Sequence, residues 1–134
     1  MLVKGELVSR WVMEKAGKYC DDMPSLGWEK DGVLVAGVTF ETYTGRSMFV
    51  HQRIDSSPPR AFWFGFADYS YNQLGCLRVT GLVESTNTKA LKLNKHIGFE
   101  IEATLKDAGE EGDLIVMVLW RDNCRFLNWS KKNE

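Results

Sequence analysis

The stretch Tyr69–Phe99, YSYNQLGCLRVTGLVESTNTKALKLNKHIGF, decides the fold of this chain. It begins inside an aromatic-rich helical pattern, which Gly75 brings to an end. Residues 76–83 then alternate between two faces, the pattern of a strand. Thr86 or Asn87 can cap a second helix, because the side-chain oxygen of either residue can accept hydrogen bonds from the free amides at a helix start, and Gly98 ends that helix. The stretch therefore predicts the order helix, strand, turn, helix.

The rest of the chain supplies further strands and one more helix. Two hairpins are expected before the aromatic helix, because Asp31-Gly32 and Thr44-Gly45-Arg46 are turn sequences between strand-forming runs. The expected elements are a helix at Glu6–Ala16 closed by Gly17, strands at Leu26–Glu29, Val33–Phe40 and Ser47–Ile54, a helix at Ala61–Leu74 with Ser57 as its cap, and strands at Cys76–Val83, Phe99–Leu105 and Leu114–Trp120. This mixture predicts an α/β or α+β fold with helices on both faces of one sheet.

The composition is that of an ordinary globular protein. The 134 residues, expected to form one domain over 1–134, carry 17 basic and 18 acidic side chains and a formal net charge of −1. This balance argues against a nucleic-acid partner. No apolar run is long enough to span a membrane and the N-terminus lacks a signal-peptide pattern, so we expect no membrane partner and a cytoplasmic protein.

The cysteines Cys20, Cys76 and Cys124 are widely separated, and no pair has the spacing of a zinc or redox site. Buried thiols in a reducing compartment fit this distribution best. We therefore expect no metal site.

The ordered motifs between residues 33 and 120 resemble the GCN5-related N-acetyltransferase (GNAT) superfamily, and within it the branch that acetylates ribosomal-protein N-termini. The phrases that carry the resemblance are Tyr69–Gly75, similar to the family's YAFxxLG, Leu77-Arg78-Val79, Asn87 followed by Ala90, Leu93–Phe99, similar to LNEKLGF, and an acidic loop with a last apolar strand at Gly109–Trp120. The resemblance implies a GNAT-like mixed, mostly antiparallel sheet with a shortened N-terminal part. It also implies acetyl-coenzyme A (acetyl-CoA) as cosubstrate and an amine as acceptor.

The same resemblance implies a set of cofactor-binding residues. The backbone of Phe49, Val50 and His51 would bind the pantetheine arm, Asn87 would contact that arm, Asn94 would lie near the thiol where many members have Tyr, and Ser56, Ser57 and Arg60 would bind the phosphates. The phosphate loop departs from the family pattern. It contains no glycine, and Pro58 and Pro59 have no amide hydrogen to donate.

His51, Glu41 and Asn94 are the candidate catalytic residues. Histidine titrates near neutrality, so His51 could take the proton of the amine; alternatively it is an exposed histidine at a strand end. Glu41 could act through a water molecule, or it is a solvated hairpin charge. Structural roles are equally open for the others: Asn94 as a solvent-facing helix residue, Asn87 as a helix cap and Arg60 as a solvated first-turn residue.

The sequence thus leads to two hypotheses from different classes. The first is an N-acetyltransferase in which a primary amine, of a protein N-terminus or a small molecule, attacks the acetyl group directly in a ternary complex. The second is a catalytically inactive GNAT-fold protein that binds a partner macromolecule, favoured by the proline-containing loop, the missing Tyr and the aromatic tail Phe126–Trp129. The sequence leaves open whether that tail packs on its own domain or in a homodimer.

Overall fold

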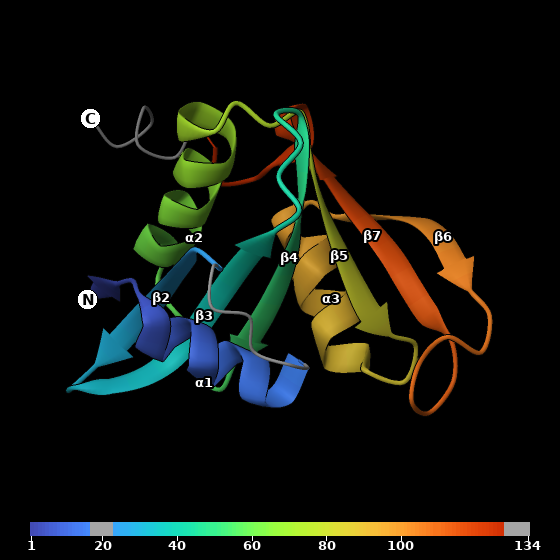
Figure 1. Ribbon diagram of the computed structural model, residues 1–134, viewed down its shortest axis with the longest axis horizontal. Coiled ribbons are helices and arrows are strands. Elements are labelled where there is room, and N and C mark those ends of the chain that lie inside the picture. The colour runs from blue at the N-terminus through green and yellow to red at the C-terminus, as the bar shows by residue number, and fades with distance from the viewer. Residues whose placement is uncertain (17–22, 128–134) are drawn as a thin grey trace.

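The computed structural model describes residues 1–16 and 23–127. Its elements are β1 (Leu2–Val3), α1 (Glu6–Ala16), β2 (Ser25–Lys30), β3 (Val33–Glu41), β4 (Ser47–Ile54), α2 (Arg60–Ala67), a π-helix (Asp68–Gln73), β5 (Arg78–Glu84), α3 (Thr88–Ile97), β6 (Glu100–Leu105), β7 (Leu114–Trp120) and a 3-10 turn (Arg121–Asn123) (Figure 1). Every predicted strand and helix is present within a few residues of its expected bounds. Cys20, Trp129 and the helix stop expected at Gly17 lie outside the described residues.

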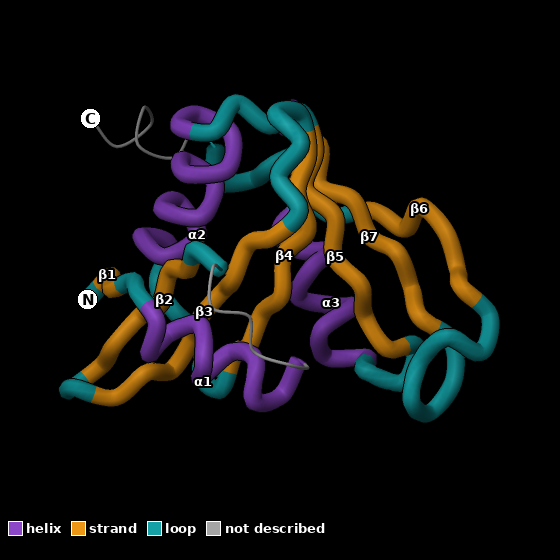
Figure 2. The backbone as a smooth tube through the Cα atoms, viewed as in Figure 1, coloured by secondary structure: helices purple, strands orange, loops and turns teal. Residues whose placement is uncertain are grey.

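One seven-stranded sheet in the order β1-β2-β3-β4-β5-β7-β6 forms the body of the molecule (Figure 2). β4 and β5 run parallel, and all the other neighbours pair antiparallel. The predicted mixed, mostly antiparallel sheet is confirmed. The single parallel pair joins a hairpin half, β1–β4, to a half in which β5 and β7 are neighbours.

Turn chemistry fixes the register of the first hairpin. Asp31 and Gly32 have φ of 54° and 80°, and they connect Lys30 to Val33, which are paired across the hairpin. Two consecutive residues at positive φ give the turn whose twist matches that of the flanking strands, and Asp-Gly is a preferred sequence for it.

Helices cover the two faces of the sheet unequally. α1 lies on one face, where Val12 is fully buried against Gly37 of β3. α2 and α3 lie on the other face, and the Phe66 ring of α2 stacks on Phe40 with 6.0 Å between ring centroids. Figure 1 shows α1 on the near side of β2 and β3, with α3 on the far side between β4 and β5. Helices on both faces were expected, and this is confirmed.

The aromatic helix differs in detail from its prediction. α2 ends at Ala67 and continues as a π-helix to Gln73, within which the Asp68 carboxylate accepts from Asn72 Nδ2 and Gln73 Nε2, both at 2.9 Å. The cap expected at Ser57 is wrong: Pro59 holds the cap position, and no side chain caps the helix. A proline fits there because the helix start needs no amide donor.

Two strand starts also differ from their predictions, because the amides of Cys76 and Phe99 donate to carbonyls at the end of the preceding helix, those of Ser70 and Asn94. β5 begins at Arg78 after Cys76, and β6 begins at Glu100 after Phe99. Cys76 and Cys124 are both buried free thiols, as expected. No helix within the described ranges is long and apolar enough to cross a membrane.

Candidate functional site

A cleft opens where the parallel pair comes apart. β4 and β5 are paired from Ser47 with Arg78 to Val50 with Gly81, yet β4 continues to Ile54 and β5 to Glu84. The two strand ends separate beyond Val50 and Gly81, as Figure 1 shows. A cavity of ≈ 1370 Å³ fills the space between them. Because strand pairing has ended, the edge of β4 from residue 51 onward has backbone groups that face the cleft instead of β5.

The helix α3 forms one wall of the cleft. Asn87 caps it, since its Oδ1 accepts from the Ala90 amide at 3.1 Å, so of the two predicted cap residues, Thr86 and Asn87, it is Asn87 that caps the helix. Gly98 ends the helix at φ 127°, a conformation that favours glycine, and the Asn94 carbonyl accepts from the Gly98 and Phe99 amides. This turn directs the buried Phe99 ring toward Gly81, where the two strands begin to separate.

His51 and Glu41 meet on the α1 face of the sheet. His51 of β4 is paired with Thr39 of β3, and paired residues lie on the same face of a sheet. The Thr39 hydroxyl lies 3.5 Å from the Met13 sulfur of α1, so the His51 side chain is also on the α1 face. His51 Nε2 lies 3.2 Å from Glu41 Oε2, and the two side chains are 24% and 38% exposed. The sequence named both residues as separate candidates. The structure brings them together as one acid–base pair beside the point where β4 leaves β5, with the His51 Nε2 atom buried against Glu41 and both side chains partly exposed.

Arg53, two residues further along β4, is fully occupied by structural contacts. Its guanidinium donates to the Trp11 carbonyl at 2.9 Å and to carboxylates of Glu14 and Asp55 at 3.1 and 2.9 Å, and it lies 3.9 Å from the Trp11 ring centre. Hydrogen bonding to Asp55 is the main cause of its raised pKa. Arg53 therefore fastens α1 to β4, and its charge is balanced before any ligand arrives.

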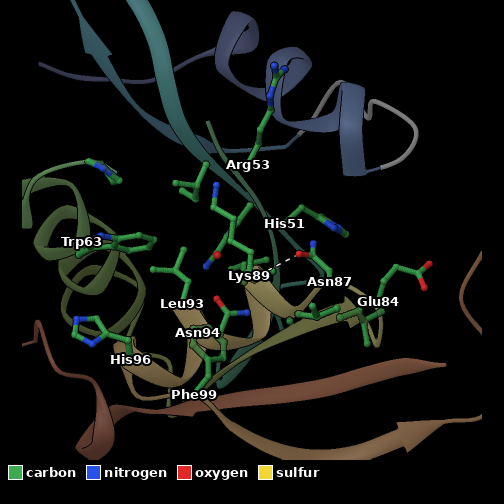
Figure 3. A pocket seen from close by; sticks show the side chains of 18 of the residues that line it. His51, Arg53, Trp63, Glu84, Asn87, Lys89, Leu93, Asn94, His96 and Phe99 are labelled. Atoms are coloured by element: carbon green, nitrogen blue, oxygen red, sulfur yellow. Dashed lines mark hydrogen bonds between the residues drawn. The ribbon is translucent and has the colours of Figure 1, made fainter. Parts of the chain in front are cut away.

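Two buried amide groups in the cleft lack hydrogen-bond partners among the described residues. Asn94 is 5% exposed, and its Oδ1 has no partner, although its Nδ2 lies 3.7 Å from Met117 Sδ. Gln52 Nε2, on β4, is also buried without a partner. Both residues line the cleft, and Figure 3 shows Asn94 among Leu93 and Phe99 on the α3 wall. A buried polar group without a partner is unfavourable, so a ligand that supplies one would be stabilised there.

The proline segment between β4 and α2 has little backbone left to offer an anion. The amides of Asp55 and Ser56 both donate to the Val35 carbonyl, at 2.8 and 3.1 Å. Pro58 and Pro59 have no amide hydrogen. Most donors that a phosphate loop would use are therefore absent or occupied.

The structure brings together most of the predicted site residues, but in different positions along the cleft. Phe49 and Val50 lie in the paired part of β4, whereas His51 begins its open part. His51, Ser56, Ser57, Arg60, Asn87 and Asn94 line the cleft with Val50, while Glu41 reaches it through His51. Asn94 is buried, so the structural alternative of a solvent-facing residue is wrong.

Gln52, Lys89 and Arg125 are among the cleft-lining residues that the sequence analysis did not name. Lys89 could have been predicted, because it lies in the first turn of the helix that Asn87 caps, and Asn87 was itself a predicted cofactor-binding residue. Alternation along β4 could have placed Gln52 beside Val50. Nothing in the sequence pattern placed Arg125, since its position depends on where the C-terminal segment returns to the core.

Comparison with known proteins identifies the architecture. No protein-family model and no curated protein matches the chain. Solved structures do match: a spermidine N-acetyltransferase SpeG variant of Vibrio cholerae, at 19% identity and a TM-score of 0.72, covers 97% of this chain and 99% of that one.

Two further structures were solved with acetyl-CoA. Campylobacter jejuni N-acetyltransferase PseH, in complex with acetyl coenzyme A, matches at 17% identity and a TM-score of 0.59 over 76% of this chain and 70% of its own. The candidate acetyltransferase yncA of Salmonella typhimurium, with its cofactor acetyl-CoA, matches at 20% identity and a TM-score of 0.61 over 77% and 67%. The chain therefore has the fold of the GNAT acetyltransferases.

Proposed function

We propose that this chain is an acetyl-CoA-dependent N-acetyltransferase. The observation that carries the proposal is the parallel pair that ends at Val50 and Gly81 and opens into a cleft large enough for an extended cofactor. An arm that enters between the strands can pair with the free edge of β4 as the missing strand would. The similar structures solved with acetyl-CoA support this assignment of the cleft.

The reaction that suits this arrangement is direct transfer within a ternary complex. The nitrogen lone pair of a neutral amine attacks the acetyl carbonyl carbon, the carbon–sulfur bond breaks, and coenzyme A leaves as a thiolate. His51 takes the proton that the amine nitrogen loses, and Glu41 at 3.2 Å stabilises the resulting imidazolium. Asn94 lies beside the leaving sulfur but has no acidic proton, so the thiolate is protonated from solvent. Holding the two substrates together supplies most of the rate.

The acceptor in this proposal is a primary amine. The resemblance of Tyr69–Gly75 and Leu93–Phe99 to the ribosomal-protein branch favours a protein N-terminus. The spermidine N-acetyltransferases among the similar structures favour a small amine. A panel containing spermidine and short peptides with free N-termini separates these two acceptor classes.

A second function remains supported by one observation. The proline segment has lost most of the backbone donors for phosphate, as expected of a GNAT-fold protein that no longer uses the cofactor. In that case the cleft or another surface would bind a macromolecule without catalysis.

A thermal melt with acetyl-CoA distinguishes the two functions. At 100 times the dissociation constant, binding to the folded state adds about 2.7 kcal/mol and raises the midpoint by roughly 10 °C for a chain of this size. His51→Gln should keep this shift and lose turnover in an assay for released thiol. No shift at millimolar acetyl-CoA would contradict the acetyltransferase proposal and favour the binding protein.

A further inference from the structure

A chain that binds coenzyme A must hold its phosphate groups, and the proline segment offers few amides for this. Of the segment's five residues, Asp55 and Ser56 donate their amides to Val35, and Pro58 and Pro59 have none. This leaves the Ser57 amide and the start of α2. Such a reduced set of donors is poorly matched to a pyrophosphate, which needs several converging donors.

Three cationic side chains line the same cleft. Arg60 begins α2, Lys89 lies in the first turn of α3, and Arg125 follows the 3-10 turn near the C-terminus. None of the three forms an ion pair with a carboxylate in the part of the chain that the structure describes. Figure 3 shows Lys89 extending from α3 into the cleft. A cation that lines a cavity without an ion-pair partner is available to bind an anionic group of a ligand.

The position of Arg125 is built into the fold. Its backbone amide donates to the Ile97 carbonyl at 3.0 Å, and the next residue, Phe126, is 7% exposed and stacks on Trp63 with 6.2 Å between ring centroids. The guanidinium Nη1 then lies 2.9 Å from His96 Nδ1 at the end of α3. The C-terminal segment is therefore anchored so that Arg125 faces the cleft from a third side.

Four carboxylates line the same cleft, those of Glu14, Asp55, Glu84 and Glu110. Glu14 and Asp55 are bound to Arg53. Glu84, at the far end of β5, accepts from the Glu110 amide at 2.7 Å, which places the Glu84 carboxylate against the loop beyond the β5 end. The cations belong instead to α2, α3 and the C-terminal segment.

We propose that the phosphate groups of coenzyme A are held by the side chains of Arg60, Lys89 and Arg125, in place of the backbone of the loop before α2. This inference rests on the proposed function and specifies how the cofactor is held. Contacts from flexible, partly hydrated side chains are screened by salt more strongly than buried amide donors. Cofactor affinity should therefore depend on ionic strength.

Calorimetric titration of coenzyme A into the full-length chain tests the proposal. Lys89→Gln and Arg125→Gln should each weaken binding about three- to tenfold, the effect of losing one partly exposed charge-assisted contact, and both should flatten its dependence on salt. Lys92→Gln is the matched control, because Lys92 is an exposed lysine on the same helix outside the cleft. Pantetheine, which has no phosphate, should bind the wild type and every variant with the same affinity.

The outcomes separate the two proposals. If the wild-type chain binds coenzyme A and the Lys89 and Arg125 variants match the Lys92 control, the side-chain phosphate site is wrong while the proposed function stands. If the wild-type chain binds no coenzyme A at millimolar concentration, the proposed function itself is wrong. Melting midpoints without ligand, expected to be equal for all variants, show that a loss of affinity does not come from unfolding.

Discussion

Replacing Gly81 by Ala should inhibit cofactor binding without destabilising the fold. Gly81 is the last β5 residue paired with β4 and lines the narrow end of the cleft. A Cβ built there meets only Phe99 Cε1, at 3.8 Å, an ordinary van der Waals distance. The free energy of unfolding should therefore stay within about 0.5 kcal/mol of the wild type, since no contact is compressed.

We expect the thioester of bound acetyl-CoA to lie at this end of the cleft, beside Asn94, so the added methyl group would overlap it. Overlap of about one methyl group in a packed site costs roughly 1–3 kcal/mol, which corresponds to a loss of affinity of about 5- to 150-fold. Urea unfolding measures the stability, and calorimetric titration with acetyl-CoA measures the affinity. We predict that Gly81→Ala lowers the acetyl-CoA affinity and leaves the stability unchanged.

Gly37→Ala is the matched control for this experiment. The same change on β3 places a Cβ 2.7 Å from Val12 Cγ2, so α1 must shift away from the sheet. Stability should fall by about 1–3 kcal/mol, and Val12→Ala should rescue part of the loss. Acetyl-CoA affinity that is unchanged in Gly81→Ala would refute the placement of the thioester, and a large stability loss there would refute the packing argument.

Three further predictions concern capping and titration. Asn87→Ala should lower the free energy of unfolding by about 1 kcal/mol in urea titration, whereas Asn87→Asp should retain the cap. Burial raises the pKa of the Cys76 and Cys124 thiols. The stability that comes from keeping these thiols neutral is therefore complete below the ordinary thiol pKa of about 8.5 and is lost as pH rises. The midpoint of urea unfolding should fall as the pH is raised above about 8.5. Hydrogen bonding from Arg78 lowers the pKa of Glu102. The stability that the ionised Glu102 carboxylate contributes is therefore present above the ordinary glutamate pKa of about 4.3 and lost as pH falls. In Glu102→Gln the free energy of unfolding should decrease less steeply as the pH is lowered.

The local patterns predicted much of the fold because local chemistry decides those elements. Leu114–Trp120 is a continuous apolar run and forms β7 over that range. Asp31-Gly32 requires a specific hairpin, and Asn87 to Gly98 carries both ends of α3. In each case a residue's backbone preference or its short polar side chain acts within a few positions along the chain.

The parts that the sequence could not predict depend on contacts between distant residues. The pairing of Glu41 with His51 follows from strand register, and the burial of Asn94 follows from the position of Met117 on β7. Asp68 accepts from two side chains of the π-helix at once, and no propensity scale encodes such a contact. Arg125 reaches the cleft only because its amide bonds to α3, on a segment with no pattern of its own.

The cleft lies where the pairing of β4 with β5 ends, beside α3. The parallel strands are paired only as far as Val50 and Gly81, although they continue to Ile54 and Glu84, and Ile97 and Phe99 are buried at the end of α3. The Gly81 position carries no side chain, so Phe99 approaches the sheet at the point where β4 turns away. Beyond it, the amides and carbonyls along β4 lose the partners that β5 would supply. An extended ligand with alternating donors and acceptors restores those hydrogen bonds, and this explains why the unpaired strand end can persist in a stable fold.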